Sequence, residues 1–467
     1  MKKISYLIVL FLIHYLGFAQ ESEIHGLLPS YAGSELVFET YTDYITHETT
    51  ILGKAKVLAD GQFSLSVKLK KSREVFVKLG IYQAFIIIEP GKSYNILLPQ
   101  KTEKSPQEKQ NPFFEEIRIF AHQKLTDSTE LNFKCLQLSK HINAYINKNL
   151  DLIATGRIRR HKVDSFILLC KQKFPAKTNS EFYRYRKYMI GDFRNLTYSG
   201  SMDIMAEKYF LDQPVLYNNQ EYMKLFNRIF DKFFVFFAQG KYGKGISEKI
   251  IMEKSLSLTK RQIRKNPLLA NDTLIEMLIL KGLYDGYYLG DYELDEVVAI
   301  LDSIEKSSII GEHRKISENI RKKITKLAVS YPAPKFELFD KDSNLVRLDR
   351  FKGKYVYLNF CSYNNFASRE DFVMLKELHK KYKDKLIIIS VSIDDDAAAF
   401  FNFVKEQKYE WVCLSIQNQQ ELLKTYNARI IPTYYLIDPY SKILIAPSFS
   451  PRENFENEFH RILNNRN

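Results

Sequence analysis

Short apolar runs separated by polar turns fill the first hundred residues of the chain. Runs rich in Val, Ile, Leu and Phe occupy residues 35–38, 63–67, 75–79 and 85–89. Several of them alternate with polar residues in steps of two, and Asp60-Gly61 and Pro90-Gly91 supply turn residues. We therefore predict a small antiparallel β-sandwich over residues 20–100.

A polar stretch, residues 101–111, is predicted to be a linker, and helical spacing follows over residues 112–330. Aromatic and aliphatic residues recur at helical intervals in residues 181–189, 227–237 and 274–289. We expect an all-α middle region. Rings interleaved with Arg and Lys also occur on surfaces that stack nucleic-acid bases, but rings at core spacing favour packing. We therefore expect no nucleic-acid partner.

Residues 331–467 contain both strand-like apolar runs and stretches with helical spacing. Apolar strands are predicted at residues 355–360, 386–393, 433–437 and 442–446. Helices are predicted near residues 369–382, 397–406, 419–426 and 452–463. This alternation is typical of an α/β domain. With 467 residues, 45% of them hydrophobic, the chain is long enough for two or three domains, so we predict a multidomain protein.

The start of this third region resembles a known family. Residues 333–348 are followed by Phe351-Lys-Gly-Lys354 and the apolar run Tyr355-Val-Tyr-Leu-Asn-Phe360. This order resembles the TlpA-like, AhpC/TSA-like branch of the thioredoxin superfamily. The resemblance implies a thioredoxin-like fold with a mixed sheet, and thiol-disulfide exchange as the usual activity.

The resemblance also places the family's two catalytic cysteines, the CxxC pair, on this sequence. Aligned without a gap from Asn359, the pair falls on Asn365 and Ser368, and no CxxC occurs elsewhere in the chain. Disulfide exchange needs an attacking thiolate and a second thiol, and neither residue supplies one. An Asn before a helix can cap it instead. We therefore expect no catalytic residue at these two positions.

Ile431-Pro432-Thr433 matches the family's cis-proline, which precedes a core strand. In the family this proline flanks the catalytic pair, and the neighbouring backbone holds an extended peptide. The resemblance thus implies a binding site made of Ile431, Pro432 and Thr433, here called the Pro432 ledge, with Asn364 and Phe366 of the preceding turn. The alternative is that Pro432 only shapes its loop.

The chain has four cysteines, too few for a disulfide scaffold. Cys135 and Cys170 lie in the predicted helical region, and one bridge between them is compatible with the sequence. Cys361 ends the strand before the turn, so it is either a buried core thiol or a thiol activated by the next helix. Cys413 lies in a strand-like run and is expected in the core.

The first nineteen residues are typical of a secretory signal peptide. Met1-Lys-Lys3 is basic, residues 4–18 are apolar, and small residues precede the expected cleavage site. The ending resembles signals of Bacteroidetes-type bacteria, and residues 20–100 resemble the DUF4369-like domain that precedes TlpA-like domains there. We expect a protein of the periplasm or cell envelope with no transmembrane segment after cleavage. The formal charge of +14 is spread along the chain and selects no partner.

Metal and cofactor patterns are weak. Nine histidines show no paired spacing, and we predict neither a metal nor a cofactor. The acidic run Asp394-Asp-Asp396 is expected to cap the helix over residues 397–406. Two hypotheses remain. The favoured one is a redox-inactive module that binds a peptide or protein partner, and the alternative is an atypical thiol-disulfide oxidoreductase that uses Cys361 alone.

Overall fold

The structure is a computed structural model that describes residues 19–464, apart from residues 106–107, 109–110, 112, 124–128, 198–201 and 418. The predicted signal peptide lies outside the described residues except for Ala19. The chain forms two compact units. The first comprises Met1–Glu103 and Glu116–Arg321, and the second comprises Lys104–Glu115 and Lys322–Asn467. Each unit is described by itself.

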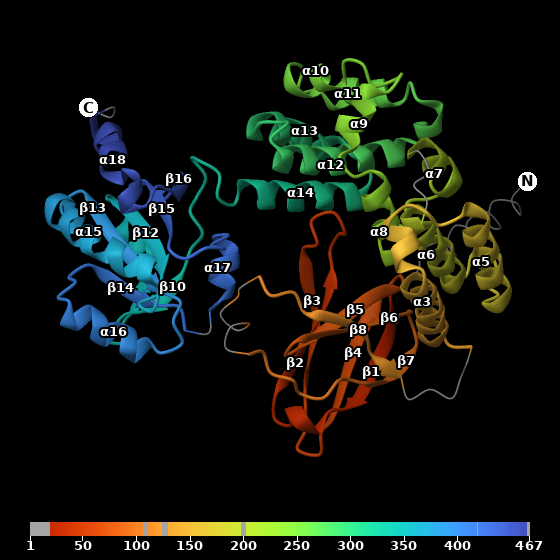
Figure 1. The fold of residues 1–467 in the computed structure, drawn as a ribbon, viewed down its shortest axis with the longest axis horizontal. Helices are drawn as coiled ribbons and strands as arrows, with labels where there is room; N and C mark the ends of the chain where they lie inside the picture. Colours follow the sequence, from red (N-terminus) through yellow and green to blue (C-terminus); the bar gives the residue numbers. More distant parts are fainter. Residues whose placement is uncertain are drawn as a thin grey trace, which may run out of the picture. The chain divides into compact units, whose positions relative to one another are not determined.

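The strands of the first unit form two sheets, with orders β4-β1-β7-β9 and β3-β2-β5-β6-β8 (Figure 1). On β4 every second residue is buried, as the two-residue period predicts. Ile24 and Val67 of one sheet and Phe38 and Val75 of the other belong to one hydrophobic cluster. The strands are β1 (Gln20–Leu27), β2 (Glu35–Tyr41), β3 (Thr49–Lys56), β4 (Gln62–Leu69), β5 (Arg73–Leu79), β6 (Tyr82–Ile88), β7 (Ser93–Leu97), β8 (Ile117–Phe120) and β9 (His122–Gln123).

Helices make up most of the rest of the first unit, which confirms a helical middle region. They are α3 (Leu131–Lys148), α4 (Leu150–Ala154), α5 (Arg160–Lys173), α6 (Glu181–Thr197), α7 (Met202–Tyr209), α8 (Gln220–Ile229), α9 (Phe233–Gln239), α10 (Ile246–Ile251), α11 (Leu256–Ile263), α12 (Asp272–Leu289), α13 (Leu294–Ser307) and α14 (Gly311–Thr325).

Two details differ from the helical pattern expected over residues 112–330. Residues 117–123 form strands β8 and β9, because Ile117 pairs with Tyr82 at the edge of one sheet and β9 pairs with β7 in the other. The helical run expected over residues 227–237 is divided between α8 and α9. Lys232 has φ +51° in the left-handed region, which a continuous α-helix does not contain.

Asparagine side chains join the strands of the first unit to its helices. Asn132 accepts a hydrogen bond from the backbone N–H of Ile87 at 2.8 Å and donates one to the Ile87 carbonyl at 2.9 Å. Asn319 donates to the buried carboxylate of Asp43 at 2.7 Å. The first contact pairs backbone groups of Ile87, and the second adds a donor to a carboxylate that Ile45 and Thr46 also hydrogen-bond. They explain why the two regions form a single unit.

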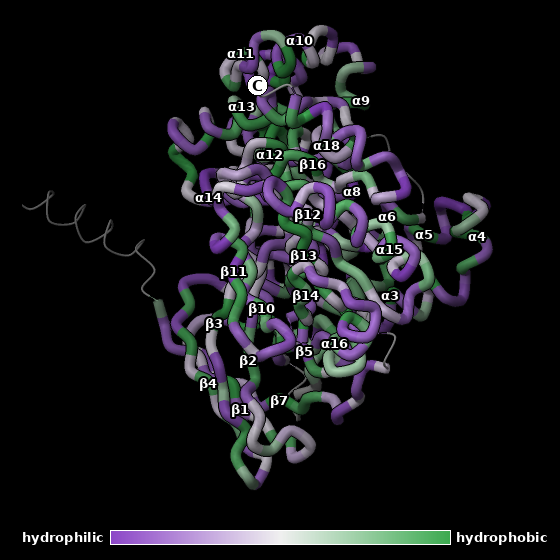
Figure 2. The backbone as a smooth tube through the Cα atoms, turned by 90° about the vertical axis from the view of Figure 1, so that its left-hand side faces the viewer, coloured by the Kyte–Doolittle hydropathy of each residue, from purple (hydrophilic) through white to green (hydrophobic). Residues whose placement is uncertain are grey.

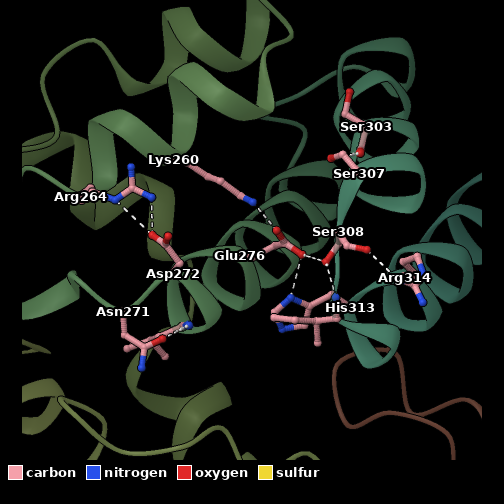
Figure 3. A network of polar contacts seen from close by, with 12 residues as sticks. Lys260, Arg264, Asn271, Asp272, Glu276, Ser303, Ser307, Ser308, His313 and Arg314 are labelled. Atoms are coloured by element: carbon pink, nitrogen blue, oxygen red, sulfur yellow. Dashed lines mark hydrogen bonds and ion pairs between the residues drawn. The ribbon is translucent and has the colours of Figure 1, made fainter.

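A buried carboxylate also holds three helices of this unit together (Figure 3). Glu276 of α12 accepts hydrogen bonds from Lys260 of α11 and from Ser308. It also contacts Nδ1 of the fully buried His313 of α14 at 2.8 Å, and Nε2 of His313 lies 2.7 Å from the hydroxyl of Tyr217. Burial alone would raise the pKa of Glu276, but these hydrogen bonds outweigh it and lower the pKa to about 2.

The second unit contains one seven-stranded mixed sheet of order β11-β10-β14-β13-β12-β15-β16. The central strands β12, β13 and β14 are parallel, and β15 runs antiparallel to β12. Most of β13 is hydrophobic in Figure 2. The strands are β10 (Glu337–Phe339), β11 (Leu345–Arg347), β12 (Tyr355–Cys361), β13 (Leu386–Ser392), β14 (Val412–Ser415), β15 (Thr433–Ile437) and β16 (Ile443–Ser448).

Side chains of β12 alternate between two hydrophobic clusters, one on each face of the sheet. Tyr357 and Cys361 belong to the cluster that α15, α16 and α18 cover, whereas Leu358 and Phe360 belong to the cluster that α17 covers. This α/β architecture is the one predicted for the C-terminal region. Its helices are α15 (Phe366–Tyr382), α16 (Ala397–Glu406), α17 (Glu421–Thr425) and α18 (Phe455–Asn464).

Across the described part of the chain, no helix combines the length and the apolar character needed to cross a lipid bilayer.

Candidate functional site

The turn between β12 and α15 carries the two positions that the resemblance assigns to catalytic cysteines. Asn365 is the N-cap of α15, and its Oδ1 accepts a hydrogen bond from the backbone N–H of Ser368 at 3.0 Å. The fully buried Ser368 hydroxyl lies 3.3 Å from the backbone N–H of Ser362 and accepts its hydrogen bond. Polar contacts therefore hold the turn without a disulfide.

Asp394, which follows β13, holds the same turn from the other side. Its buried carboxylate accepts hydrogen bonds from the Ser362 hydroxyl at 2.6 Å and from the backbone N–H of Tyr363 at 2.9 Å. The hydroxyl of Ser392 donates a third at 2.7 Å. Asp396, by contrast, caps α16 through the N–H of Ala399, as expected of the acidic run. The sequence alone does not distinguish the roles of these two carboxylates.

A second buried carboxylate lies on α15, about one helical turn after Ser368. Asp371 is fully buried and accepts hydrogen bonds from Nε of Arg452 at 2.6 Å and from the hydroxyl of Tyr434 at 2.8 Å. Burial is the main reason that the pKa of Tyr434 lies well above its ordinary value, so the phenol stays protonated and donates. Because Tyr434 is on β15, this contact joins α15 to the strand that follows the Pro432 ledge.

Cys361 lies at the end of β12 and is buried, with 1% of its surface exposed. Its thiol points toward the carbonyl of Val391, with the sulfur 3.6 Å from that oxygen. Burial, followed by the nearby Cys413 and Asp394, raises the pKa of Cys361 well above its ordinary value. A thiol in this environment is protonated near neutral pH and is a poor nucleophile.

The other three cysteines are also buried and free. Burial raises the pKa of Cys413 on β14 and raises that of Cys170 to about 11. Cys135 and Cys170 belong to one hydrophobic cluster of the first unit, and neither is in a disulfide. All four cysteines of the sequence are therefore thiols without surface access in this structure.

The Pro432 ledge lies beside the end of β12. The Ile431–Pro432 peptide bond is cis, and Thr433 pairs with Phe360 one residue before Cys361. The hydroxyl of Thr433 donates a hydrogen bond to the carbonyl of Ile430. The three ledge residues are partly exposed, so the surface next to the turn is accessible.

Exposed apolar side chains flank this surface. Phe366, the first residue of α15, is 69% exposed, and Ile430, which precedes the ledge, is 76% exposed. Asn364 is exposed at the turn, and its side chain reaches Asp394 at 3.4 Å. The predicted binding residues thus lie around the carboxyl end of β12, the end at which open α/β sheets commonly bind ligands. Within the described residues, no group of His, Cys, Asp and Glu side chains is arranged to hold a metal ion.

The C-terminal part of the chain is similar in sequence to known proteins. The model of the AhpC/TSA family matches residues 329–445. The thiol-disulfide oxidoreductase ResA of Bacillus thuringiensis subsp. konkukian is 32% identical over 120 residues, which cover 26% of this chain and 69% of the relative. The chain belongs to the AhpC/TSA family. A more distant relative in the family, ResA of Bacillus subtilis, is 24% identical over 132 residues, covering 28% of this chain and 73% of the relative.

Solved structures similar to this AhpC/TSA chain include two proteins from Bacteroides. The thioredoxin domain of a thiol-disulfide oxidoreductase from Bacteroides vulgatus is 26% identical and covers 29% of this chain and 98% of its own, with a TM-score of 0.27. A thiol:disulfide interchange protein from Bacteroides sp. is 27% identical and covers 29% of this chain and 91% of its own, with a TM-score of 0.27.

Proposed function

We propose that the C-terminal domain is a redox-inactive module that binds a peptide or protein partner. One observation supports this proposal: Asn365 and Ser368, to which the family resemblance assigns the thiol pair, are joined by a hydrogen bond from the backbone N–H of Ser368 to Oδ1 of Asn365. Neither side chain can form a mixed disulfide. We infer that the turn keeps the family's fold while lacking the groups for the family's usual reaction.

The accessible surface beside the turn supports the binding role. The Pro432 ledge is partly exposed, and the exposed side chains of Phe366 and Ile430 lie at the same end of the sheet. Extended peptides bind at such places through backbone hydrogen bonds, and apolar side chains supply the contact area. Asn364, Phe366 and the Pro432 ledge are therefore the residues proposed to contact the partner.

The second candidate function is thiol-disulfide exchange by Cys361 alone, and the names of the curated relatives favour it. The burial of Cys361 and its raised pKa weigh against it, because the thiolate is the reactive form. A one-thiol reaction would also need a cysteine of another protein to resolve the mixed disulfide.

The place of action is part of the same proposal. The basic and apolar start of the sequence supports export to the periplasm or cell envelope. The single hydrophobic cluster shared by the two N-terminal sheets supports a DUF4369-like β-sandwich over residues 20–100. We propose the predicted division into sandwich, helical region and thioredoxin-like domain as the functional organisation of the chain.

Selection of a displayed random-peptide library on the purified full chain tests the binding role. Selected peptides should lose affinity for Phe366→Ser, because this change removes an exposed ring beside the ledge. Val373→Ser is the matched control, since Val373 is 60% exposed on the same helix two turns away. Failure to select any peptide, or equal loss in both variants, would contradict the proposed binding site.

A further inference from the structure

A short segment of the chain, Lys104–Glu115, belongs to the second unit although the residues on both sides of it belong to the first. The chain leaves the first unit after Glu103 and returns to it at Glu116, and the residues between belong to the unit that contains the Pro432 ledge. Residues 111–116 read Asn-Pro-Phe-Phe-Glu-Glu. Two aromatic residues followed by two acidic residues stand out in a stretch that is otherwise polar. Aromatic rings are stabilised by burial away from water, so their presence here indicates a contact.

Phe113 of this segment contacts the C-terminal domain. The guanidinium carbon of Arg429 lies 4.3 Å from the centre of the Phe113 ring, within the range of a cation–π interaction. The backbone N–H groups of Phe113 and Phe114 donate hydrogen bonds to the side chain and the carbonyl of Asn111. This turn directs Phe113 toward Arg429, whereas the Phe114 ring lies 4.5 Å from Nζ of Lys104.

Arg429 stands at the edge of the Pro432 ledge. It is two residues before Ile431, and its Nε donates a hydrogen bond to Asn427, which steadies the guanidinium. Ile430, between Arg429 and the ledge, stays 76% exposed. Phe113 therefore contacts the guanidinium of Arg429 beside the ledge, and both Arg429 and Ile430 stay exposed.

The segment also suits this edge chemically. Glu115 is exposed and follows the aromatic pair, so the segment offers an aromatic ring and a carboxylate next to a basic and apolar surface. A tethered segment has a high effective concentration and competes with free peptides even when its own contact is weak.

We propose that Phe113 holds residues 113–115 at the approach to the Pro432 ledge, and that an aromatic, acidic peptide must displace Phe113 from Arg429 to bind. This inference rests on the proposed binding function. It names the chemical class of partner, an extended peptide with an aromatic residue followed by a carboxylate, and it makes the chain's own segment the competitor.

Fluorescence anisotropy on the full chain, with a labelled peptide of the sequence of residues 108–117, tests the inference. Phe113→Ala should bind the peptide about two- to fivefold more tightly than the wild type, the range that an exposed cation–π contact represents. Phe114→Ala is the matched control and should bind like the wild type. The double variant Phe113→Ala with Arg429→Ala should not show this increase in peptide affinity.

If the wild type and Phe113→Ala bind the peptide with equal affinity, Phe113 does not compete with the peptide, and this inference is wrong. The proposed peptide binding itself would be unaffected. Absence of binding to every variant would overturn the choice of partner chemistry. Peptides selected from the random library decide the proposed function separately, because their test depends on Phe366 and not on Phe113.

Discussion

Asn365 accepts a hydrogen bond from the backbone N–H of Ser368, with 3.0 Å between the two atoms. These are the two positions at which the family resemblance places catalytic cysteines. The contact is an N-cap, which satisfies one of the amide groups that the first turn of a helix leaves unpaired. The same turn is therefore stabilised by a side chain that has no redox chemistry.

Replacing Asn365 with Ala should destabilise the C-terminal domain by about 0.5–2 kcal/mol, the usual cost of removing an N-cap. Urea unfolding followed by tryptophan fluorescence measures this directly, because Trp411 is the only tryptophan of the chain and is buried in this domain. Asn365→Asp keeps the accepting oxygen and should unfold close to the wild type. Equal destabilisation by both substitutions would show that the N-cap hydrogen bond does not stabilise the domain.

Combining Asn365→Cys with Ser368→Cys should give the chain a dithiol pair and more disulfide-reducing activity than the wild type. A thiol at residue 365 would stand at the start of α15, where the helix dipole lowers a thiol pKa, and a thiol at residue 368 would be buried behind it as the resolving group. Reduction of insulin disulfides measures the gain. Each single variant lacks the second thiol and should stay inactive, and an inactive double variant would show that the turn geometry is also lost.

Glu276→Gln should destabilise the helical region in a pH-dependent way. The pKa of Glu276 lies at about 2 in the folded chain, below the ordinary value of 4.5, so its charge stabilises the fold above about pH 4.5. This contribution is lost as the pH falls from about 4.5 toward 2, because the unfolded chain takes up the proton first.

Far-UV circular dichroism during heating, at pH 7 and at pH 3, measures this difference. The melting temperature of Glu276→Gln should lie well below that of the wild type at pH 7, and the difference should be smaller at pH 3. Glu318→Gln removes an exposed ion pair with Lys315 and should change stability little at either pH. An equal difference in melting temperature at both pH values would mean that the substitution destabilises the fold through packing and not through the lost charge.

The core strands of the C-terminal domain were predictable because they are continuous apolar runs. Strand β13 was predicted at residues 386–393 and is found at Leu386–Ser392. The division of the helical run at Lys232 was not predictable, since a single residue in the left-handed region leaves the hydrophobic spacing intact. The edge strand β8 was missed because its four residues are too few for a clear period.

At the site, the sequence indicated which residues lie near the turn but not how they are held. Asp394 and Asp396 have the same side chain two residues apart, and only the structure shows that the first points inward and the second caps α16. Asp371 had a usable signal, because it shares the inward face of its helix with Ser368 and Leu375 at three- and four-residue spacing. A carboxylate on a buried helix face calls for a partner, and Tyr434 and Arg452 supply it.

The most direct test of the redox-inactive account is the rate at which the thiols of the purified chain react with an aromatic disulfide reagent at neutral pH. We expect slow reaction at all four cysteines, accelerated by denaturant, and the same slow rate at the remaining thiols of Cys361→Ser. A fast phase in the wild type that disappears in Cys361→Ser would show that Cys361 is a reactive thiol and that the domain is not redox-inactive.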